Sequence, residues 1–264
     1  MDLLLKNKVV VVTGGTSGIG LATVRRLLEE GGKVAFCART ESKVQEISKL
    51  LVADFGECNV LGQAVDVLDK DAVIRFKDQV EREFGQCDGL ITNAGQGRVS
   101  TFLETEDQDW RDELELKYFS QLNPINAFKP LLDRSEVGAI VAVNSLLAYQ
   151  PEPHMVCTSS ARAGVQNLLK SISVEFAPSI RVNSILIGLV ESAQWMRRFD
   201  ARDDKSISKE KWFEELASKK GIPLKRLGKA QEAANTILFL VSPVSSYVTG
   251  AHIEDPAVYH GLFE

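Results

Sequence analysis

Short runs of apolar residues alternate along this chain with longer segments in which apolar residues recur every three or four positions. The first two runs are Val9–Val12 and 33–38. Continuous apolar runs of this length are typical of strands that are buried on both faces of a sheet. Between them, Val24, Leu27 and Leu28 have helical spacing. The pattern therefore predicts a strand–helix–strand unit with a parallel pair of strands.

The same alternation continues toward the end of the chain. Helices are predicted at 42–55, 69–84, 106–133, 155–176 and 232–241, and further strands at 60–67, 90–92, 138–143, 180–186 and 247–253. Pro124 and Pro130 are expected to kink or divide the long helix, because proline cannot donate the helical hydrogen bond. Since no repeat or linker interrupts the alternation, the sequence predicts an α/β fold: one domain over 1–264, with a doubly wound parallel sheet and helices on both faces.

Small or polar residues follow six of the predicted strands. The glycine-rich stretch Thr13–Gly20 follows the first strand. The later strand ends carry Arg39, Asp66, Asn93-Ala94-Gly95, Ser145 and Gly188. Ligands of doubly wound sheets bind outside these strand ends, and the free N–H groups at a helix start attract phosphate. The sequence therefore predicts a nucleotide site, although a glycine turn alone is also explained by its backbone conformation.

Arg39 bears on which nucleotide binds. An acidic residue at the end of the second strand would accept hydrogen bonds from a ribose 2′-hydroxyl, whereas an arginine suits a 2′-phosphate. We therefore predict NADP(H) in preference to NAD(H). The alternative is a surface arginine beside the Ser42 cap of the next helix.

Composition narrows the function further. The chain has 264 residues, 44% of them hydrophobic, and a net charge of −5. This balance argues against a nucleic-acid or anionic-membrane partner. No apolar stretch is long enough for a signal peptide or a membrane span, so we expect a cytoplasmic protein. The four cysteines, at 37, 58, 87 and 157, lack a metal-ligand spacing, which predicts buried free thiols and no metal site.

Several of these motifs together resemble the short-chain dehydrogenase/reductase family, from about Leu5 to Glu254. The resemblance rests on Thr13-Gly14-xxx-Gly18-x-Gly20, Asp66-Val67, Asn93-Ala94-Gly95 and Arg181–Ile185 ahead of Gly188. It implies a Rossmann-like fold, a dinucleotide cofactor, hydride transfer between a carbonyl and an alcohol, and usually a homotetramer. The cofactor contacts expected from it are Gly14, Thr16, Ser17, Gly18, Ile19, Gly20, Arg39, Asp66, Val67, Asn93, Ala94, Gly95, Arg162 and Gly188.

The chain departs from this family at the catalytic positions. The family's chemistry uses an asparagine, a serine, and a tyrosine followed four residues later by a lysine. Ser145 matches the serine, but Thr158 stands at the tyrosine position, Arg162 at the lysine position and Lys117 at the asparagine position. No YxxxK occurs elsewhere in the chain. Thr158 and Arg162 share the inward stripe of their predicted helix, so the substitutions fall at the site itself.

A proton donor other than threonine is therefore needed if the site reduces a carbonyl. A threonine hydroxyl is too weakly acidic, and an arginine stays protonated. Lys117 is the first candidate, because burial beside Arg162 would lower the pKa of its amine; a plain structural or ion-paired lysine is the alternative. His154 is a second candidate, whereas Tyr149 fits a packing or lid residue better.

The segment 191–221 resembles the family's substrate lid. Its aromatic residues are Trp195, Phe199, Trp212 and Phe213, which would suit an apolar or aromatic small-molecule substrate. The alternative is an amphipathic helix pair packed on the core, with its arginines in solvent. Ile187 replaces the proline that usually precedes Gly188 in the family, so the family pattern does not predict the backbone path of this loop.

Two functions remain compatible with the sequence. The first is an NADP(H)-dependent oxidoreductase with an altered proton relay, in which Lys117, His154 or water supplies the proton. The second is a nucleotide-binding subunit or sensor that keeps the fold without carbonyl reduction, as a homo-oligomer or beside an active homologue. A lyase or isomerase that uses the same pocket is a third and weaker hypothesis.

Overall fold

A parallel sheet of seven strands lies at the centre of the computed structural model, which describes residues 1–202, 204 and 206–255. In spatial order the strands are β3 (Val60–Ala64), β2 (Lys33–Ala38), β1 (Val9–Thr13), β4 (Gly89–Thr92), β5 (Ala139–Ser145), β6 (Arg181–Ile187) and β7 (His252–Asp255). Every pair of neighbours is parallel. The strand order reverses between β1 and β4, which places the expected ligand crevice beyond the carboxyl ends of these two strands.

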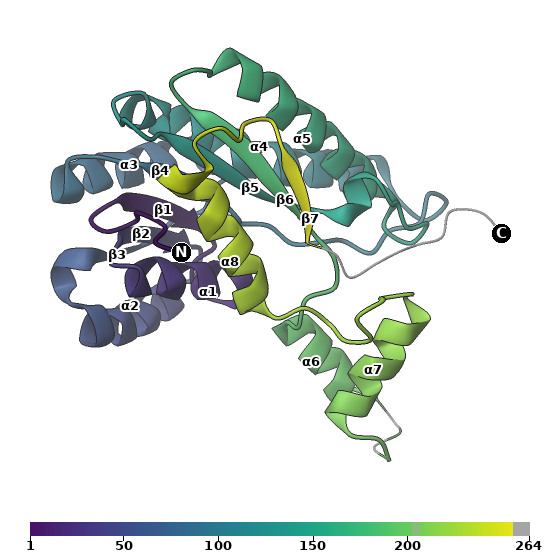
Figure 1. Ribbon diagram of the computed structural model, residues 1–264. Helices are drawn as coiled ribbons and strands as arrows, with labels where there is room; N and C mark the ends of the chain where they lie inside the picture. The colour runs from purple at the N-terminus through teal and green to yellow at the C-terminus, as the bar shows by residue number, and fades with distance from the viewer. Residues whose placement is uncertain (203, 205, 256–264) are drawn as a thin grey trace.

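Helices cover both faces of the sheet (Figure 1). One face carries α1 (Gly18–Glu29), α2 (Glu41–Phe55) and α8 (Ala230–Val241), and the other carries α3 (Lys70–Phe84), α4 (Asp107–Leu132) and α5 (Val156–Glu175). Along β1, Val10 and Val12 face the first layer, while Val9 and Val11 face the second. The predicted doubly wound Rossmann-like fold is confirmed, and its strands are apolar on both sides because both faces are buried.

Some element boundaries differ from the predicted ones. The second helix begins at Glu41, with Thr40 and not Ser42 as its N-cap residue, and the third strand ends at Ala64 instead of residue 67. Short 3₁₀ turns occur at η1 (Glu57–Asn59), η2 (Leu146–Ala148) and η3 (Pro243–Ser245). Residues 256–264 of the predicted domain lie outside the described part of the chain.

The long helix α4 is continuous, and the prediction that its prolines divide it is wrong. Pro124 and Pro130 both lie inside α4. Between them and beyond, the apolar residues Ile125, Phe128 and Leu131 are buried in the layer that α4 shares with α3 and α5. Tertiary packing of this kind outweighs the cost of a proline inside a helix, which is about 3 kcal/mol for the lost hydrogen bond and the ring clash together.

Two helices, α6 (Ala193–Asp200) and α7 (Lys209–Lys219), form an arm beyond the end of β6 (Figure 1). This arm has its own small core, built on Phe213 and Ala217 of α7 with Trp195 and Trp212 packed against it. It corresponds to the segment predicted as a substrate lid. Its alternative as a helix pair with all arginines in solvent does not hold for Arg202, whose guanidinium lies 4.1 Å from the ring centre of Phe199.

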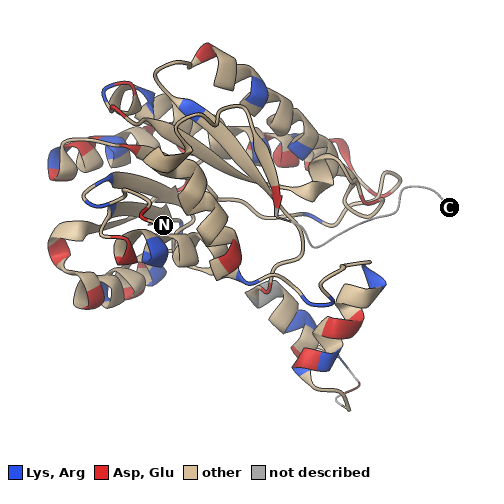
Figure 2. Cartoon of the chain, in the orientation of Figure 1, with Lys and Arg blue, Asp and Glu red and all other residues tan. Residues whose placement is uncertain are grey.

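Charged residues of both signs are found mostly on the outer helices, and most of the sheet carries none (Figure 2). Within the described residues, no helix is both long enough and apolar enough to span a membrane. All four cysteines are free thiols. Cys37, Cys87 and Cys157 are buried as expected, whereas Cys58 is exposed because it falls on the surface turn η1.

Candidate active site

A cavity of about 600 Å³ lies at the carboxyl ends of the strands. Most of the residues singled out from the sequence line it: Gly14, Thr16, Ser17, Gly18, Ile19, Arg39, Asp66, Val67, Asn93, Ala94, Gly95, Lys117, Ser145, Arg162 and Gly188. Gly20 and Thr158 are not part of its lining. A volume of this order is sufficient for a small-molecule ligand.

The glycine turn between β1 and α1 is shaped for close approach. Gly14 and Gly18 have φ angles of +71° and +54°, which residues with a side chain rarely adopt. A Cβ on Gly20 would lie 2.1 Å from the carbonyl oxygen of Gly14, so Gly20 serves the packing of the helix on the turn. Ser17, the N-cap residue of α1, makes no side-chain cap bond. The first N–H groups of α1 are therefore available to a phosphate, which fits a dinucleotide.

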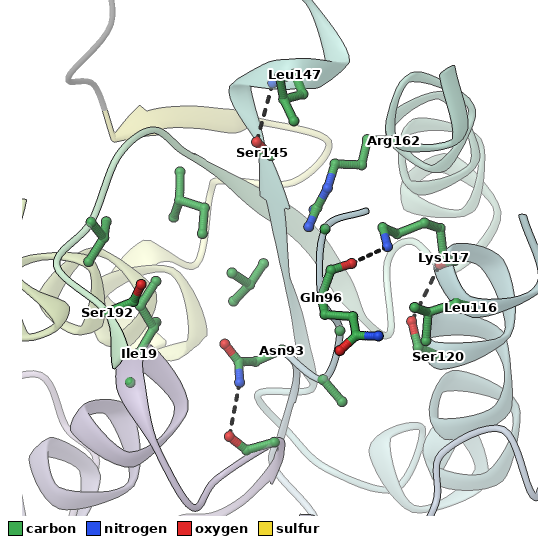
Figure 3. A pocket seen from close by; sticks show the side chains of 18 of the residues that line it. Ile19, Asn93, Gln96, Leu116, Lys117, Ser120, Ser145, Leu147, Arg162 and Ser192 are labelled. Carbon is green, nitrogen blue, oxygen red and sulfur yellow. Dashed lines mark hydrogen bonds between the residues drawn. The ribbon is translucent and has the colours of Figure 1, made fainter. Parts of the chain in front are cut away.

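Asn93 fixes this turn from the neighbouring strand. Its amide donates to the carbonyl oxygens of Thr13 at 3.0 Å and Gly14 at 3.2 Å, and Figure 3 shows one bond from this amide. In return, the Thr13 hydroxyl accepts the N–H groups of Asn93 and Ala94, each at 3.0 Å. These bonds join the ends of β1 and β4, and they hold both sides of the cavity at the point where the strand order reverses.

The part of the cavity at β2 and β3 carries Arg39, which was predicted to select the nucleotide, and the expected cofactor contacts Asp66 and Val67. Arg39 is exposed at the end of β2 and makes no ion pair within the described part of the chain. Asp66 accepts the N–H of Leu68 at 3.0 Å, and the Asn123 amide donates to the Val67 carbonyl at 2.9 Å. These bonds hold the backbone of the turn after β3, and the Arg39 guanidinium is left free for an anionic group.

Lys117 is a buried cation that reaches the cavity from α4. Only 5% of its side chain is exposed, and its ammonium lies 2.9 Å from the Glu113 carboxylate. It also donates to the backbone carbonyl of Gln96, as Figure 3 shows. Burial, and then the positive charge of Arg162, lower the pKa of Lys117, while Glu113 raises it. An ammonium has three N–H donors, so one remains for a group in the cavity.

Glu113 was not identified from the sequence. Its side chain is 3% exposed and is shared between Lys117 and Thr158, whose hydroxyl donates to the same carboxylate oxygen. The available signal was its position four residues before Lys117, which places both residues on one face of the helix. Thr158 also accepts the backbone N–H of Arg98 at 3.1 Å. Thr158 therefore faces inward as predicted, but toward α4 and the loop after β4, outside the cavity lining.

Arg162 lines the cavity beside Lys117, and the two side chains point toward the same space (Figure 3). Its guanidinium donates to the Asn144 side chain at 3.2 Å, and the Asn144 amide donates back to the Arg162 carbonyl at 3.1 Å. Burial lowers the pKa of Arg162 to about 10, so the group is still cationic at neutral pH. Its Nε is buried without a partner in the described residues. Such an orphaned donor is available to a hydroxyl group of a bound ligand.

Ser145 ends β5 and lines the same cavity as the two cations. Its hydroxyl oxygen accepts the N–H of Leu147 at 3.3 Å, and its O–H has no acceptor among the described residues. The parallel pairing of β5 and β6 continues to Ser145 and Ile187. The isoleucine in place of the family's proline thus leaves β6 regular up to Gly188, and Ser145 keeps an O–H to offer to a ligand.

The other candidates have more peripheral positions. His154 lines the cavity, but it is exposed and lies 2.9 Å from Glu152. Tyr149 does not line the cavity and stacks beside His252. Of the four aromatic residues of the arm only Trp195 lines the cavity, because the other three pack on one another and on the small core of the arm. The cavity lining is nevertheless largely apolar, with Leu146, Met155 and Leu189 beside Trp195, and an apolar or aromatic substrate stays a prediction.

Comparison with known proteins agrees with this architecture. A family model for the short chain dehydrogenases matches residues 8–203, so the chain belongs to the short-chain dehydrogenase/reductase family. It is 30% identical to the acetoacetyl-CoA reductase of Synechocystis, over 98% of this chain and 99% of that one.

Two solved proteins are also similar over nearly their whole length. The first is a short chain oxidoreductase from Pseudomonas aeruginosa PAO1, described as containing an atypical catalytic center, with 53% identity, a TM-score of 0.92 and 97% of both chains covered. A structure of that protein with NADPH bound has 52% identity and a TM-score of 0.91, with 98% of this chain and 99% of that one covered. The second is the L-sorbose reductase of Gluconobacter frateurii, complexed with NADPH and L-sorbose, with 28% identity, a TM-score of 0.92 and 100% of both chains covered.

Proposed function

We propose that this chain is an NADP(H)-dependent carbonyl reductase in which Lys117, and not a tyrosine, donates the proton to the substrate oxygen. The observation that carries the proposal is the position of the Lys117 ammonium. It is buried, it lines the same cavity as Ser145 and Arg162, and two of its three donors are used by Glu113 and Gln96. The remaining donor is left for the substrate.

The cavity suits NADP(H) at both ends. The N–H groups at the start of α1 would hold the pyrophosphate, Arg39 would pair with the 2′-phosphate, and the orphaned Nε of Arg162 would bond a ribose hydroxyl. Related proteins support this choice, since the oxidoreductase from Pseudomonas aeruginosa and the L-sorbose reductase both have NADPH-bound structures. When bound, the cofactor supplies the hydride.

Two side chains, Ser145 and Lys117, would act on the substrate oxygen. Ser145 would donate its O–H to the carbonyl oxygen and orient it. As negative charge develops on that oxygen, Lys117 would stabilise it and then transfer a proton along the same hydrogen bond. The surroundings favour this transfer, because burial and Arg162 lower the pKa of Lys117. Once Lys117 has lost its proton, the positive charge of Arg162 is balanced by the negative charge of Glu113.

The arm at 191–221 would act as the substrate lid of the domain. Its support is the ion pair of Lys220, just after α7, with Glu152 at 2.9 Å, which ties the arm to the loop before α5 at the cavity. We keep the expectation of a homo-oligomer, which size-exclusion chromatography with light scattering would measure.

Turnover with defined variants tests the proposal. The purified chain is mixed with NADPH and a panel of ketones, aldehydes and acyl thioesters, and the loss of NADPH absorbance is followed. We expect turnover by the wild type, its loss in Lys117→Met, and unchanged NADPH affinity in that variant by fluorescence titration. An exposed lysine, Lys49, gives the matched control Lys49→Met. Full turnover by Lys117→Met refutes the role of Lys117 as proton donor. NADPH binding by the wild type without turnover of any substrate supports the alternative function of a nucleotide-binding subunit or sensor.

A further inference from the structure

We propose that Glu113 is the positioning residue of this active site: it holds the Lys117 ammonium at the cavity, and Thr158 holds Glu113. The inference rests on the proposed role of Lys117 for its catalytic consequence. It assigns a function to a buried acid that the sequence motifs do not mark, and to a threonine that does not reach the cavity.

The contacts form a chain that leads from the helix packing to the cavity. Thr158 on α5 donates to the Glu113 carboxylate on α4, and the same oxygen of Glu113 lies 2.9 Å from the Lys117 ammonium. Both α4 residues are almost fully buried, at 3% and 5% exposure. Lys117 is a long and flexible side chain, so a fixed carboxylate on its own helix determines which of its rotamers is occupied.

The charges around Lys117 show what Glu113 contributes. Two cations face the ammonium: Arg162 from α5 and Arg98 from the loop after β4, and both lower the pKa of Lys117. Burial acts in the same direction and is the largest cause. Glu113 on α4 is the group that opposes them, through its hydrogen bond and its charge. Without it, the amine would lose its proton at a lower pH and would lack the acid form needed to protonate an alkoxide.

A direct titration of Lys117 tests this role without a substrate. The chain is produced with lysine that carries ¹³C at Cε, the resonance of Lys117 is assigned by its absence in Lys117→Met, and its chemical shift is followed with pH. In Glu113→Gln we expect the midpoint to move to lower pH by about one to two units, the size of a lost charge-assisted hydrogen bond. The exposed neighbour Glu115 gives the control Glu115→Gln, with no shift of the Lys117 midpoint.

Two further variants cover the chance that Glu113→Gln does not fold, which circular dichroism would show. Glu113→Asp keeps the charge but withdraws it by one methylene, and Thr158→Val keeps both charges but removes the hydroxyl that fixes the carboxylate. Each should move the midpoint in the same direction by less than Glu113→Gln. An unchanged midpoint in Glu113→Gln, or in Glu113→Asp where only that variant folds, overturns the role of Glu113, and an unchanged midpoint in Thr158→Val overturns that of Thr158.

The outcome for Glu113 is separate from that for the proposed function. If Lys117 is the proton donor, the alkaline limb of kcat/KM moves by the same amount as the titration midpoint in each variant. If Lys117→Met turns over normally while the midpoint still moves in Glu113→Gln, the proposed function fails and the positioning of Lys117 stands. If Lys117→Met is inactive and the midpoint does not move, the proposed function stands and this inference fails.

Discussion

Removal of Glu113 should destabilise the folded chain by an amount that depends on pH. Glu113→Gln leaves the Lys117 ammonium buried beside Arg162 with no carboxylate next to it. Breaking a buried ion pair in this way typically costs about 3–5 kcal/mol. Thr158 loses a charged acceptor as well, although the glutamine oxygen can still accept its hydroxyl.

Deprotonation of Lys117 sets an upper limit to this cost. If the unpaired ammonium is too unfavourable, the amine loses its proton instead, which costs about 5 kcal/mol at pH 7 for a lysine with an unfolded pKa of about 10.4. The same deprotonation costs only about 2 kcal/mol at pH 9. Because the folded variant then binds fewer protons than the unfolded chain, its stability rises with pH. The deficit of Glu113→Gln relative to wild type should therefore fall from about 3–5 kcal/mol at pH 7 to no more than about 2 kcal/mol at pH 9.

Thermal and urea unfolding followed by circular dichroism measure this deficit. At pH 7 we expect a fall in Tm of roughly 10 °C, and a much smaller one at pH 9. The double variant Glu113→Gln with Lys117→Met removes both charges and should recover most of the lost stability, since an apolar replacement of a buried ion pair is often neutral. A deficit that is equal at the two pH values, or a double variant no more stable than Glu113→Gln, would refute the reasoning.

Three further outcomes follow from the cavity. Arg39→Ala should weaken NADPH binding by roughly 10- to 100-fold while leaving NADH binding unchanged, because only the 2′-phosphate loses a charged partner; equal losses in fluorescence titrations would contradict this. Ser145→Ala should lower kcat/KM for carbonyl reduction by roughly 100-fold with unchanged NADPH affinity, and an unaffected kcat/KM would exclude the serine from the reaction. Gly20→Ala should lower Tm and NADPH affinity, since its Cβ would lie 2.1 Å from the Gly14 oxygen; a variant as stable as wild type in thermal unfolding would speak against that close packing.

The parts of the structure that depend on local pattern could be predicted from the sequence. The continuous apolar runs at β1, β2 and β5 indicated strands buried on both faces, and both faces are covered by helices. The residues after each strand lie together because parallel strands bring their carboxyl ends to one edge. This is why Arg39, Asp66 and Ser145, far apart in sequence, line one cavity.

The features that depend on how helices pack could not be predicted in this way. Helical spacing correctly placed Thr158 on the inward side of α5, but that side faces both the cavity and α4, and spacing alone does not distinguish them. Whether Pro124 divides α4 depended on the packing of its neighbours, which is a tertiary effect. The aromatic residues of the arm posed the same problem, because a substrate pocket and a small core require the same apolar side chains.

The altered residues of the site form one connected arrangement, which bears on whether the cavity is a working site. A threonine at the tyrosine position cannot reach the cavity, yet its hydroxyl holds the carboxylate that pairs with Lys117, the residue at the asparagine position. Arg162, at the lysine position, retains a buried donor without a partner. A buried ion pair adds little stability compared with apolar residues of similar size. Proton transfer to a substrate oxygen requires an acid at this point of the cavity, and under the proposed function Lys117, whose pKa is lowered by burial and by Arg162, would supply it.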